Sequence, residues 1–299
     1  MQIRNFREAE QKLFDIIQDI KRNLSIHSPY KYSGINDPLG ILLDIKIKEQ
    51  KLYGEYGWYL NESPDTGKPT VVLDTTSSDE ERLNFTFFHE IVHHLIRSDN
   101  EIYAFIDKVA TQNDDLKNIK ERLANIGAAE FLLPGKDIKD AINKNSFSIK
   151  LILELDKKYP ASKPAIAIQL ARQAIHKCFV IVCEYGPIPN KDTKQPELIK
   201  QERVSETNYL HIRYAASSPT NNYSIGSYAI IPKSHILNDI YKNKLPLAKG
   251  KDIIPFRSGT DWSVPCEGIF YKGKVYAVFN IESPPPPASL QPELFKFPN

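Results

Sequence analysis

Hydrophobic positions in the first half of the chain recur at the three- and four-residue spacing of amphipathic helices. Residues 5–24 carry apolar side chains at that spacing with charges between them, which predicts a helix. Residues 84–96 are rich in Phe, Val, Leu and Ile and predict a buried helix. Residues 101–120 are polar but helical in pattern, and a segment of small residues, 121–133, predicts a closely packed helix that ends at Pro134.

Aromatic and β-branched residues gather in two runs directly before the helix at 84–96. These runs, 51–60 and 70–74, are separated by Pro and Gly, and they predict a small antiparallel sheet. Residues 76–81 then supply a cap and an acidic first turn for the helix. We expect an edge of the sheet to lie beside this helix, where an extended peptide could add as a strand.

Two short helices are predicted at 150–157 and 163–174, on either side of Tyr159-Pro160. Two helices joined by a short turn have the shape of a helix-turn-helix unit. Their basic residues form no dense stripe, so we expect the pair to pack structurally. Docking of a partner or substrate and reading of DNA are the alternatives.

From Cys178 onward, short strands alternate with polar loops, which predicts a second α+β unit. Its expected elements are strands at 179–182, 210–214 and 228–231, a helix at 234–241, and a hairpin at 268–279. The chain therefore divides into four parts: residues 1–142, residues 143–177, residues 178–282, and an extended Pro-rich tail at 283–299.

Composition narrows the classes of protein to consider. The 299 residues are 41% hydrophobic, enough for a sizeable core, and 39 basic residues nearly balance 37 acidic ones. This charge balance does not indicate a basic surface that would bind nucleic acid. We expect no membrane span, since no segment is apolar enough, and no signal peptide, since the N-terminus lacks an apolar core. We expect a cytoplasmic protein whose three cysteines are buried thiols rather than a disulfide framework.

The buried helix at 84–96 contains the candidate chemistry. His89 and His93 are four residues apart, so about 400° of helical turn places them on one face. Two imidazoles so placed can share one Zn²⁺, and Glu90 can take a proton from a water at that ion. Two histidines and a carboxylate would also be costly to bury unless they were bonded or bound to metal.

A third ligand is expected on the small-residue helix. Glu121, Asn125 and Ala128 lie on one of its faces, which makes Glu121 the favoured ligand and Asn125 a partner that orients the ligands. Asp99 is the competitor, six residues after His93, although Ile96 stands where the chain would need a glycine to turn back. The remaining alternative is a site with no third protein ligand.

Two further polar residues are expected to lie off the site. His94 is about 100° further round the helix than His93, so we expect it to be a hydrogen-bonding neighbour of the site and not a ligand. Glu130 points away from Glu121 by about 180° and is expected to be solvated.

These two helices resemble those of the ImmA/IrrE family of metallopeptidases. That family pairs an FT-x-x-HE-x-x-H helix with an E-x-x-A-N-x-x-A-x-x-LL-x-P helix, and this chain resembles both motifs within residues 35–175. The resemblance implies that His89, His93 and Glu121 bind Zn²⁺, with Mn²⁺ as an alternative ion, and that Glu90 is the general base. It also implies a zincin-like helical metallopeptidase fold for residues 1–142.

Two positions depart from the family pattern. Val92 stands where the family usually has glycine, and Gly127 replaces the usual aromatic residue of the second motif. We expect Val92 to narrow the site and Gly127 to loosen the packing of the ligand helix. Neither change removes a chemical group.

The resemblance further implies a zinc-dependent endopeptidase of the gluzincin type. Its layout is similar to family members with a peptidase unit, a helix-turn-helix-like unit and a GAF-like sensor domain, here 178–282, whose ligand is unknown. The implied substrate is a helix-turn-helix transcriptional repressor, cut in a stress or DNA-damage response, and direct nucleic-acid binding is not expected. Tyr53, Tyr56 and Tyr59 are the candidates to stabilise the oxyanion.

Two rival functions stay open. The protein could be a metal-dependent regulatory or binding protein, or an effector of a toxin–antitoxin module, in both cases with little proteolysis. Glu90 adds nothing to metal binding alone, so its presence favours catalysis.

Overall fold

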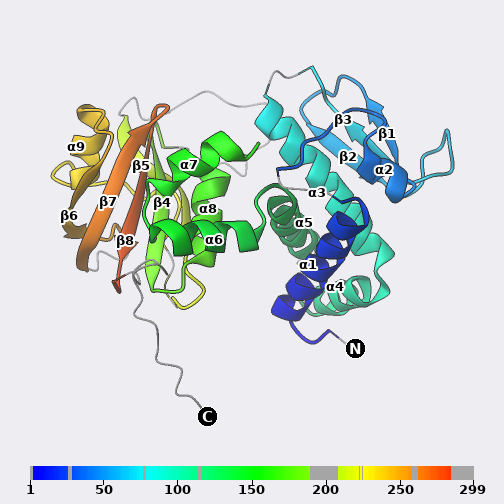
Figure 1. Cartoon of the computed structure of the whole chain (residues 1–299), viewed down its shortest axis with the longest axis horizontal. Coiled ribbons are helices and arrows are strands. Elements are labelled where there is room, and N and C mark those ends of the chain that lie inside the picture. Colours follow the sequence, from blue (N-terminus) through cyan, green and yellow to red (C-terminus); the bar gives the residue numbers. More distant parts are fainter. Residues whose placement is uncertain are drawn as a thin grey trace, which may run out of the picture. The chain divides into compact units, whose positions relative to one another are not determined.

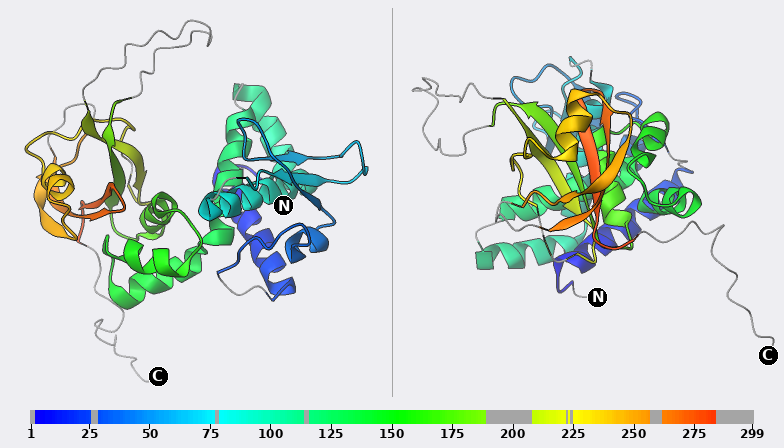
Figure 2. Two further views of the ribbon diagram at one scale, coloured as in Figure 1. Left: turned by 90° about the horizontal axis from the view of Figure 1, so that it is seen from above. Right: turned by 90° about the vertical axis from the view of Figure 1, so that its left-hand side faces the viewer.

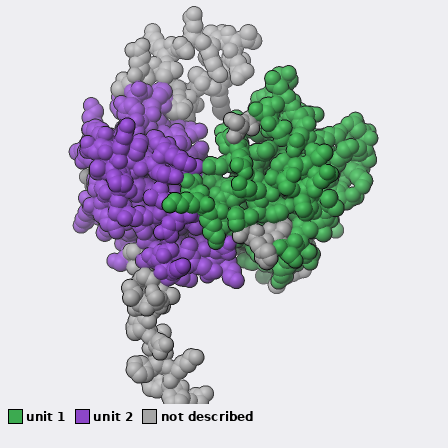
Figure 3. Space-filling view, turned by 45° about the horizontal axis from the view of Figure 1, so that its top comes forward, with its two compact units in different colours: residues 1–134, 156–162 green, residues 135–155, 163–299 purple. Residues whose placement is uncertain are grey.

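The computed structural model describes residues 3–25, 29–76, 79–113, 116–188, 208–221, 223, 225–256 and 262–283, and the predicted tail lies almost wholly outside them. The chain forms two compact units, residues 1–134 with 156–162, and residues 135–155 with 163–299 (Figure 3). The finer four-part division stays a prediction. None of the described helices combines the length and apolar character that a membrane span requires.

Among the described residues, the helices of the N-terminal part of the chain belong to the first unit (Figure 1). They are α1 (Phe6–Asn23), α2 (Pro38–Leu42), α3 (Glu80–Ser98), α4 (Asn100–Asn113) and α5 (Leu116–Leu132). Asp79 caps α3 by accepting a hydrogen bond from the backbone N–H of Arg82, and two glutamates follow in the first turn, as the sequence predicts.

The small sheet is mixed, so the prediction of an antiparallel sheet is wrong in part. Strands β1 (Lys46–Glu49), β3 (Thr70–Leu73) and β2 (Gly57–Leu60) lie in that order, with β1 parallel and β2 antiparallel to β3. β1 escaped prediction because it is short and mostly charged. The run at 51–60 yields a strand only from Gly57, since Gly54 adopts a positive φ of 89° and turns the chain.

Helix α3 occupies the middle of the first unit. It packs against α5 and α4 and also contacts β2 and β3, while α1 packs on the same group of helices. Its apolar side chains are buried, among them Phe87, Phe88, Ile91 and Val92. Burial of each such side chain is worth about 1.5–3 kcal/mol. The helix that carries the candidate ligands is therefore held from several sides, as the hydrophobic run at 84–96 predicts.

The second unit is built on a five-stranded antiparallel sheet, seen from two further directions in Figure 2. The strand order is β5 (Tyr209–Ser217), β4 (Cys178–Gly186), β8 (Lys274–Asn280), β7 (Ser263–Tyr271), β6 (Ala248–Ile253). The segment expected as a strand at 228–231 forms no regular strand, but it pairs with β5 through the bridge between Ile230 and His211 and through backbone hydrogen bonds to Leu210 and Ile212. Tyr228 has a positive φ of 65°, which interrupts an extended strand there.

Helices cover both faces of this sheet. Helix α8 (Lys163–Gln173) packs on β4 and β5, while α9 (Ile236–Lys242) packs on β6, β7 and β8. The described residues also form α6 (Gly135–Asn145) and α7 (Leu151–Lys158), so the pair predicted around Tyr159-Pro160 is present as α7 and α8. Because both faces are covered, the first six residues of β4 are all buried.

The three cysteines are free and buried, as predicted, and all lie in strands of this sheet. Cys178 and Cys183 are on β4, and Cys266 is on β7. Burial raises the pKa of the Cys178 thiol to about 12 and also raises the pKa of Cys183 and Cys266.

Candidate metal centre

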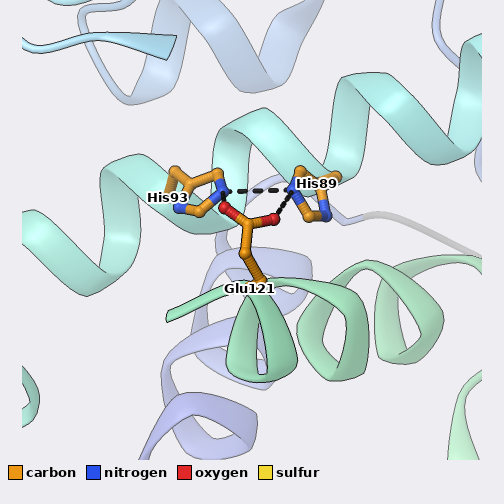
Figure 4. A group of neighbouring side chains, drawn as sticks. All are labelled: His89, His93 and Glu121. Carbon is orange, nitrogen blue, oxygen red and sulfur yellow. Dashed lines mark hydrogen bonds and ion pairs between the residues drawn. The ribbon is translucent and has the colours of Figure 1, made fainter. Parts of the chain in front are cut away.

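Helix α3 presents two imidazoles toward one point. His89 and His93 lie one turn apart on the same face, and their Nε2 atoms are 3.1 Å from each other (Figure 4). Their rings meet edge to face, with centroids 4.7 Å apart. The four-residue spacing therefore places both histidines on one face of the helix, as helical geometry predicts.

Helix α5 brings the third donor to the same point. The Glu121 carboxylate lies 3.2 Å from Nε2 of His89 and 3.5 Å from Nε2 of His93, measured to its two different oxygens. The helix approaches α3 through buried small residues, including Ala124, Gly127 and Ala128. Among the described residues, these three side chains form the group whose donor atoms could hold a metal ion.

Asp99, the competing ligand, is placed elsewhere. Helix α3 continues to Ser98, and the Asp99 carboxylate then caps α4 by accepting hydrogen bonds from the backbone N–H groups of Glu101 and Ile102. The same carboxylate pairs with Lys12 at 3.1 Å. Ile96 continues the helix, as expected, so the chain cannot turn back to the histidines.

The donor set fits a divalent transition metal. Two imidazole nitrogens and one carboxylate are ligands that Zn²⁺ accepts, and ligands on a tetrahedral zinc at about 2.0–2.1 Å lie about 3.3 Å from one another. The separations of 3.1, 3.2 and 3.5 Å match that spacing. Two imidazole nitrogens and a carboxylate repel one another at such distances unless a cation or protons lie between them.

Burial disfavours protonation of His89 and His93. It lowers the pKa of His89, and the nearby negative charge of Glu121 opposes that effect only in part. Burial, followed by the neighbouring His89, also lowers the pKa of His93. Both rings are therefore held neutral near pH 7, which is the form that binds metal.

Glu90 follows His89 in the sequence but points to a different neighbour. It is buried, with 7% of its surface exposed, and the backbone N–H of Tyr59 in β2 lies close enough to its carboxylate to favour the charged form. Burial first, and then the negative charges of Glu121 and Glu55, together raise the pKa of Glu90 to about 7. A buried carboxyl with such a pKa beside a metal-binding group is suited to proton transfer.

Asn125 lies near His89, and its expected role in orienting the ligands stays a prediction. Its amide reaches the His89 imidazole and favours the charged form of that ring, although burial has the larger, opposite effect on the pKa. Nδ1 of His89 is buried, and within the described residues it makes no hydrogen bond of normal geometry.

His94 and Glu130 both have partners. His94 is a hydrogen-bonding neighbour, as predicted: its Nδ1 lies 3.1 Å from the Tyr59 hydroxyl and its Nε2 lies 3.2 Å from Oγ of Ser98. The expectation that Glu130 is solvated is wrong. Its carboxylate accepts a hydrogen bond from Gln18 at 3.0 Å, because α1 covers the face of α5 that was expected to be open.

The three tyrosines named as oxyanion stabilisers differ in position. Tyr53 is 87% exposed, and the Tyr56 ring lies under the guanidinium of Arg82. The hydroxyl of Tyr59 is already bonded to His94. The backbone contact between Tyr59 and Glu90 was missed from the sequence; the aromatic run directly before the ligand helix was its signal.

Comparisons with known proteins agree with this geometry. A family model described as the IrrE N-terminal-like domain matches residues 42–171. The radiation response metalloprotease IrrE of Deinococcus deserti is 27% identical over 192 residues, 63% of each chain. The protein of the same name from Deinococcus radiodurans is 24% identical over 217 residues, 71% of this chain and 63% of that protein. The matches thus span less than two thirds of the length of these relatives.

A solved structure extends the likeness in fold to most of the chain. A Mycobacterium tuberculosis transcriptional regulator matches with a TM-score of 0.51 over 91% of this chain and 76% of that chain, at 13% sequence identity. This match bears on fold alone. The family match over the ligand helices carries more weight for the site, and it shows that the chain contains an IrrE N-terminal-like domain and is a distant homologue of the radiation response metalloproteases IrrE.

Proposed function

We propose that the protein is a metal-dependent endopeptidase of the gluzincin type, with Zn²⁺ as its metal and Mn²⁺ as the alternative. The observation that carries this proposal is the convergence of donor atoms from His89, His93 and Glu121 beside a buried Glu90. An ion held by these donors would supply a Lewis acid for a peptide carbonyl and would acidify water. The zincin-like character of the first unit is part of the same proposal.

Glu90 is the residue that moves the proton. Its carboxylate would accept a proton from the attacking water and deliver it to the amine that leaves. A carboxyl does both best when its pKa lies near the working pH, and burial raises that of Glu90 to about 7.

A polypeptide is the substrate class that the surroundings favour. β2 is an edge strand of the small sheet and contacts α3, so an extended chain could pair with it beside Glu90. Asp74 donates its backbone N–H to the Tyr56 carbonyl, which turns the polar groups of Tyr56 toward β3. By the alternation of an antiparallel strand, Gly57 and Tyr59 turn theirs outward, and because the Tyr59 N–H lies close to Glu90, a substrate would pair with Gly57 and with the Tyr59 carbonyl.

We further propose that the substrate is a helix-turn-helix repressor, cut in a stress or DNA-damage response. The names of the two Deinococcus relatives, radiation response metalloproteases, support a stress role. In this proposal α7 and α8 form a helix-turn-helix-like unit, and the five-stranded sheet belongs to a GAF-like sensor that gates activity. The protein acts in the cytoplasm and binds no nucleic acid directly.

The rival is a metal-dependent regulatory protein or toxin–antitoxin effector with little proteolysis. It would need the three ligands but not Glu90. The placement of a buried carboxyl with a raised pKa against the edge strand favours proteolysis over this rival.

The test uses Glu90→Gln in the full-length protein, with Glu81→Gln on the same helix as the matched control. Each protein is loaded with Zn²⁺ and added to a host lysate, and new protein N-termini are labelled and sequenced. We expect Glu90→Gln to keep its metal and to lose cleavage by about three orders of magnitude, while Glu81→Gln resembles the wild type. Cleavage by Glu90→Gln at a wild-type rate would overturn the mechanism, and metal binding without new termini in any sample would favour the rival.

A further inference from the structure

Helix α3 carries two neighbouring stripes with different partners. His89 and His93 face Glu121 of α5. Thr86, Glu90 and His94 recur every four residues and form the adjacent stripe, and all three contact the edge strand β2. The second stripe supplies no metal ligand, and its neighbours on β2 include Gly57 and Tyr59.

Gly57 allows the strand to approach the helix. A Cβ at this position would lie 2.5 Å from Cγ2 of Thr86 and 3.1 Å from the carbonyl oxygen of Val72. Neither group can move freely, since one belongs to a β-branched side chain and the other to the central strand. Glycine is therefore needed for β2 to lie against α3 one turn before Glu90.

Tyr59 is bound to the stripe at two points. Its hydroxyl lies 3.1 Å from Nδ1 of His94, and its backbone N–H lies close to the Glu90 carboxylate. The two rings also meet edge to face, with centroids 5.7 Å apart. One residue of the edge strand thus contacts the turn of α3 after Glu90 through its side chain, while its backbone lies close to the Glu90 carboxylate.

The His94 ring is itself fixed. Its second nitrogen, Nε2, lies 3.2 Å from Oγ of Ser98, one turn further along α3. A hydroxyl at each ring nitrogen fixes the plane of the imidazole in either neutral tautomer. His94 can therefore act as an anchor for the Tyr59 side chain, and hence for the strand.

We propose that Tyr59 and His94 are positioning residues that hold the edge strand in register with Glu90. The inference rests on the proposed peptidase function, because the base and the strand that would receive substrate are the two parts being aligned. Loss of the Tyr59–His94 contact frees the strand, so the Tyr59 N–H no longer fixes the carboxylate. Misplacement of a catalytic group by about 1 Å can cost about a hundredfold in rate.

The first test needs no activity. Amide hydrogen exchange at Tyr59 is followed by NMR in the full-length protein, with Zn²⁺ content measured alongside. We expect Tyr59→Phe and His94→Leu each to speed exchange of this amide by about tenfold at unchanged metal content. His94→Asn should keep the slow exchange, because its side chain offers an acceptor close to the position of Nδ1. Equal exchange rates in the wild type and His94→Leu would overturn the proposal.

Kinetics supply the second test, on any peptide that the wild type cleaves and Glu90→Gln does not. We expect Tyr59→Phe, His94→Leu and the double variant to show the same fall in kcat, about tenfold, because each breaks one shared contact. Tyr30→Phe is the matched control, since it removes a hydroxyl bonded to Asp37 in the same unit and should lower the melting temperature without changing kcat. Additive losses would overturn the positioning role, whereas cleavage that survives Glu90→Gln would overturn the proposed function instead.

Discussion

Val92 on α3 packs directly against the bare Cα of Gly127 on α5. A Cβ at Gly127 would lie 2.8 Å from both γ carbons of Val92 and 3.1 Å from Cδ2 of Leu13. The two departures from the family motifs are therefore one departure, because volume added at Val92 is accommodated by volume removed at Gly127. The expectation that Gly127 loosens the ligand helix is wrong, since the missing side chain lets α3 and α5 meet closely beside His93 and Glu121.

Gly127→Ala should consequently destabilise the first unit, although alanine is the better helix former by about 1 kcal/mol. Overpacking costs about 1–3 kcal/mol, and Val92 cannot turn aside because its χ1 is restricted in a helix. Denaturant unfolding followed by Trp58 fluorescence in a Trp262→Phe background measures this cost. The double variant Val92→Ala with Gly127→Ala should recover most of the loss, and simple addition of the two single effects would contradict the pairing.

Glu121→Ala should lower metal affinity by more than about a hundredfold, since even residues that only orient a ligand cost about 10–100-fold when lost. Zn²⁺ content after dialysis measures the effect. Asp99→Asn is the control: it weakens the cap of α4 and the pair with Lys12, so it should lower stability and leave the metal content unchanged. Loss of metal from Asp99→Asn would restore Asp99 as a ligand.

Chelation should destabilise the first unit selectively. Metal at about a thousand times its dissociation constant stabilises the folded form by about 4 kcal/mol, and the ligands lie in this unit alone among the described residues. The chain has two tryptophans, Trp58 in the first unit and Trp262 in the second. Variants that keep one tryptophan each should show a lower unfolding midpoint on chelation at Trp58 but not at Trp262. Equal shifts at both would mean that the units unfold together.

Acid should destabilise the second unit through its buried histidines. Burial lowers the pKa of His176 and of His235, although Asn280 and Glu282 oppose the effect at His176 and Ile253 and Asp252 oppose it at His235. As pH falls, the histidines of the unfolded chain take up protons before those of the folded chain. The stabilisation from the two neutral histidines is therefore complete above about pH 6.5, and it is lost as pH falls through the lower pKa of the folded state. Unfolding midpoints from Trp262 fluorescence between pH 5 and 8 test this.

His235→Asn isolates one of these two groups. His235 caps α9 by accepting a hydrogen bond from the backbone N–H of Leu237 at 3.1 Å, and asparagine can cap without titrating. The variant should therefore show a shallower loss of stability below pH 6.5. An unchanged pH profile would assign the effect to other groups.

The sequence predicted what depends on local spacing. The turn between His89 and His93, the cap at Asp79 and the pair of helices around Tyr159-Pro160 all follow from positions close together in the chain. The prediction that Glu121 is the third ligand also rested on a sequence pattern, the one on the second helix.

Features that depend on distant packing were not predictable in the same way. Glu130 was misjudged because nothing near it in sequence indicates that α1 would cover it. The parallel pairing of β1 with β3 joins residues 24 positions apart across a turn-rich segment. The pairing of Val92 with Gly127 is visible only when both helices are in place, because neither residue alone has an unusual sequence context.

The cysteines carry a consequence for how the protein could meet an oxidant. All three thiols lie inside the sheet of the second unit, and burial raises the pKa of each, so almost none is thiolate at neutral pH. Oxidants could therefore react with these thiols only after the sheet opens, and the thiols of the folded protein should not respond to a change in redox state. The rate at which a thiol reagent labels the protein therefore measures how often the second unit opens, because the first unit contains no cysteine.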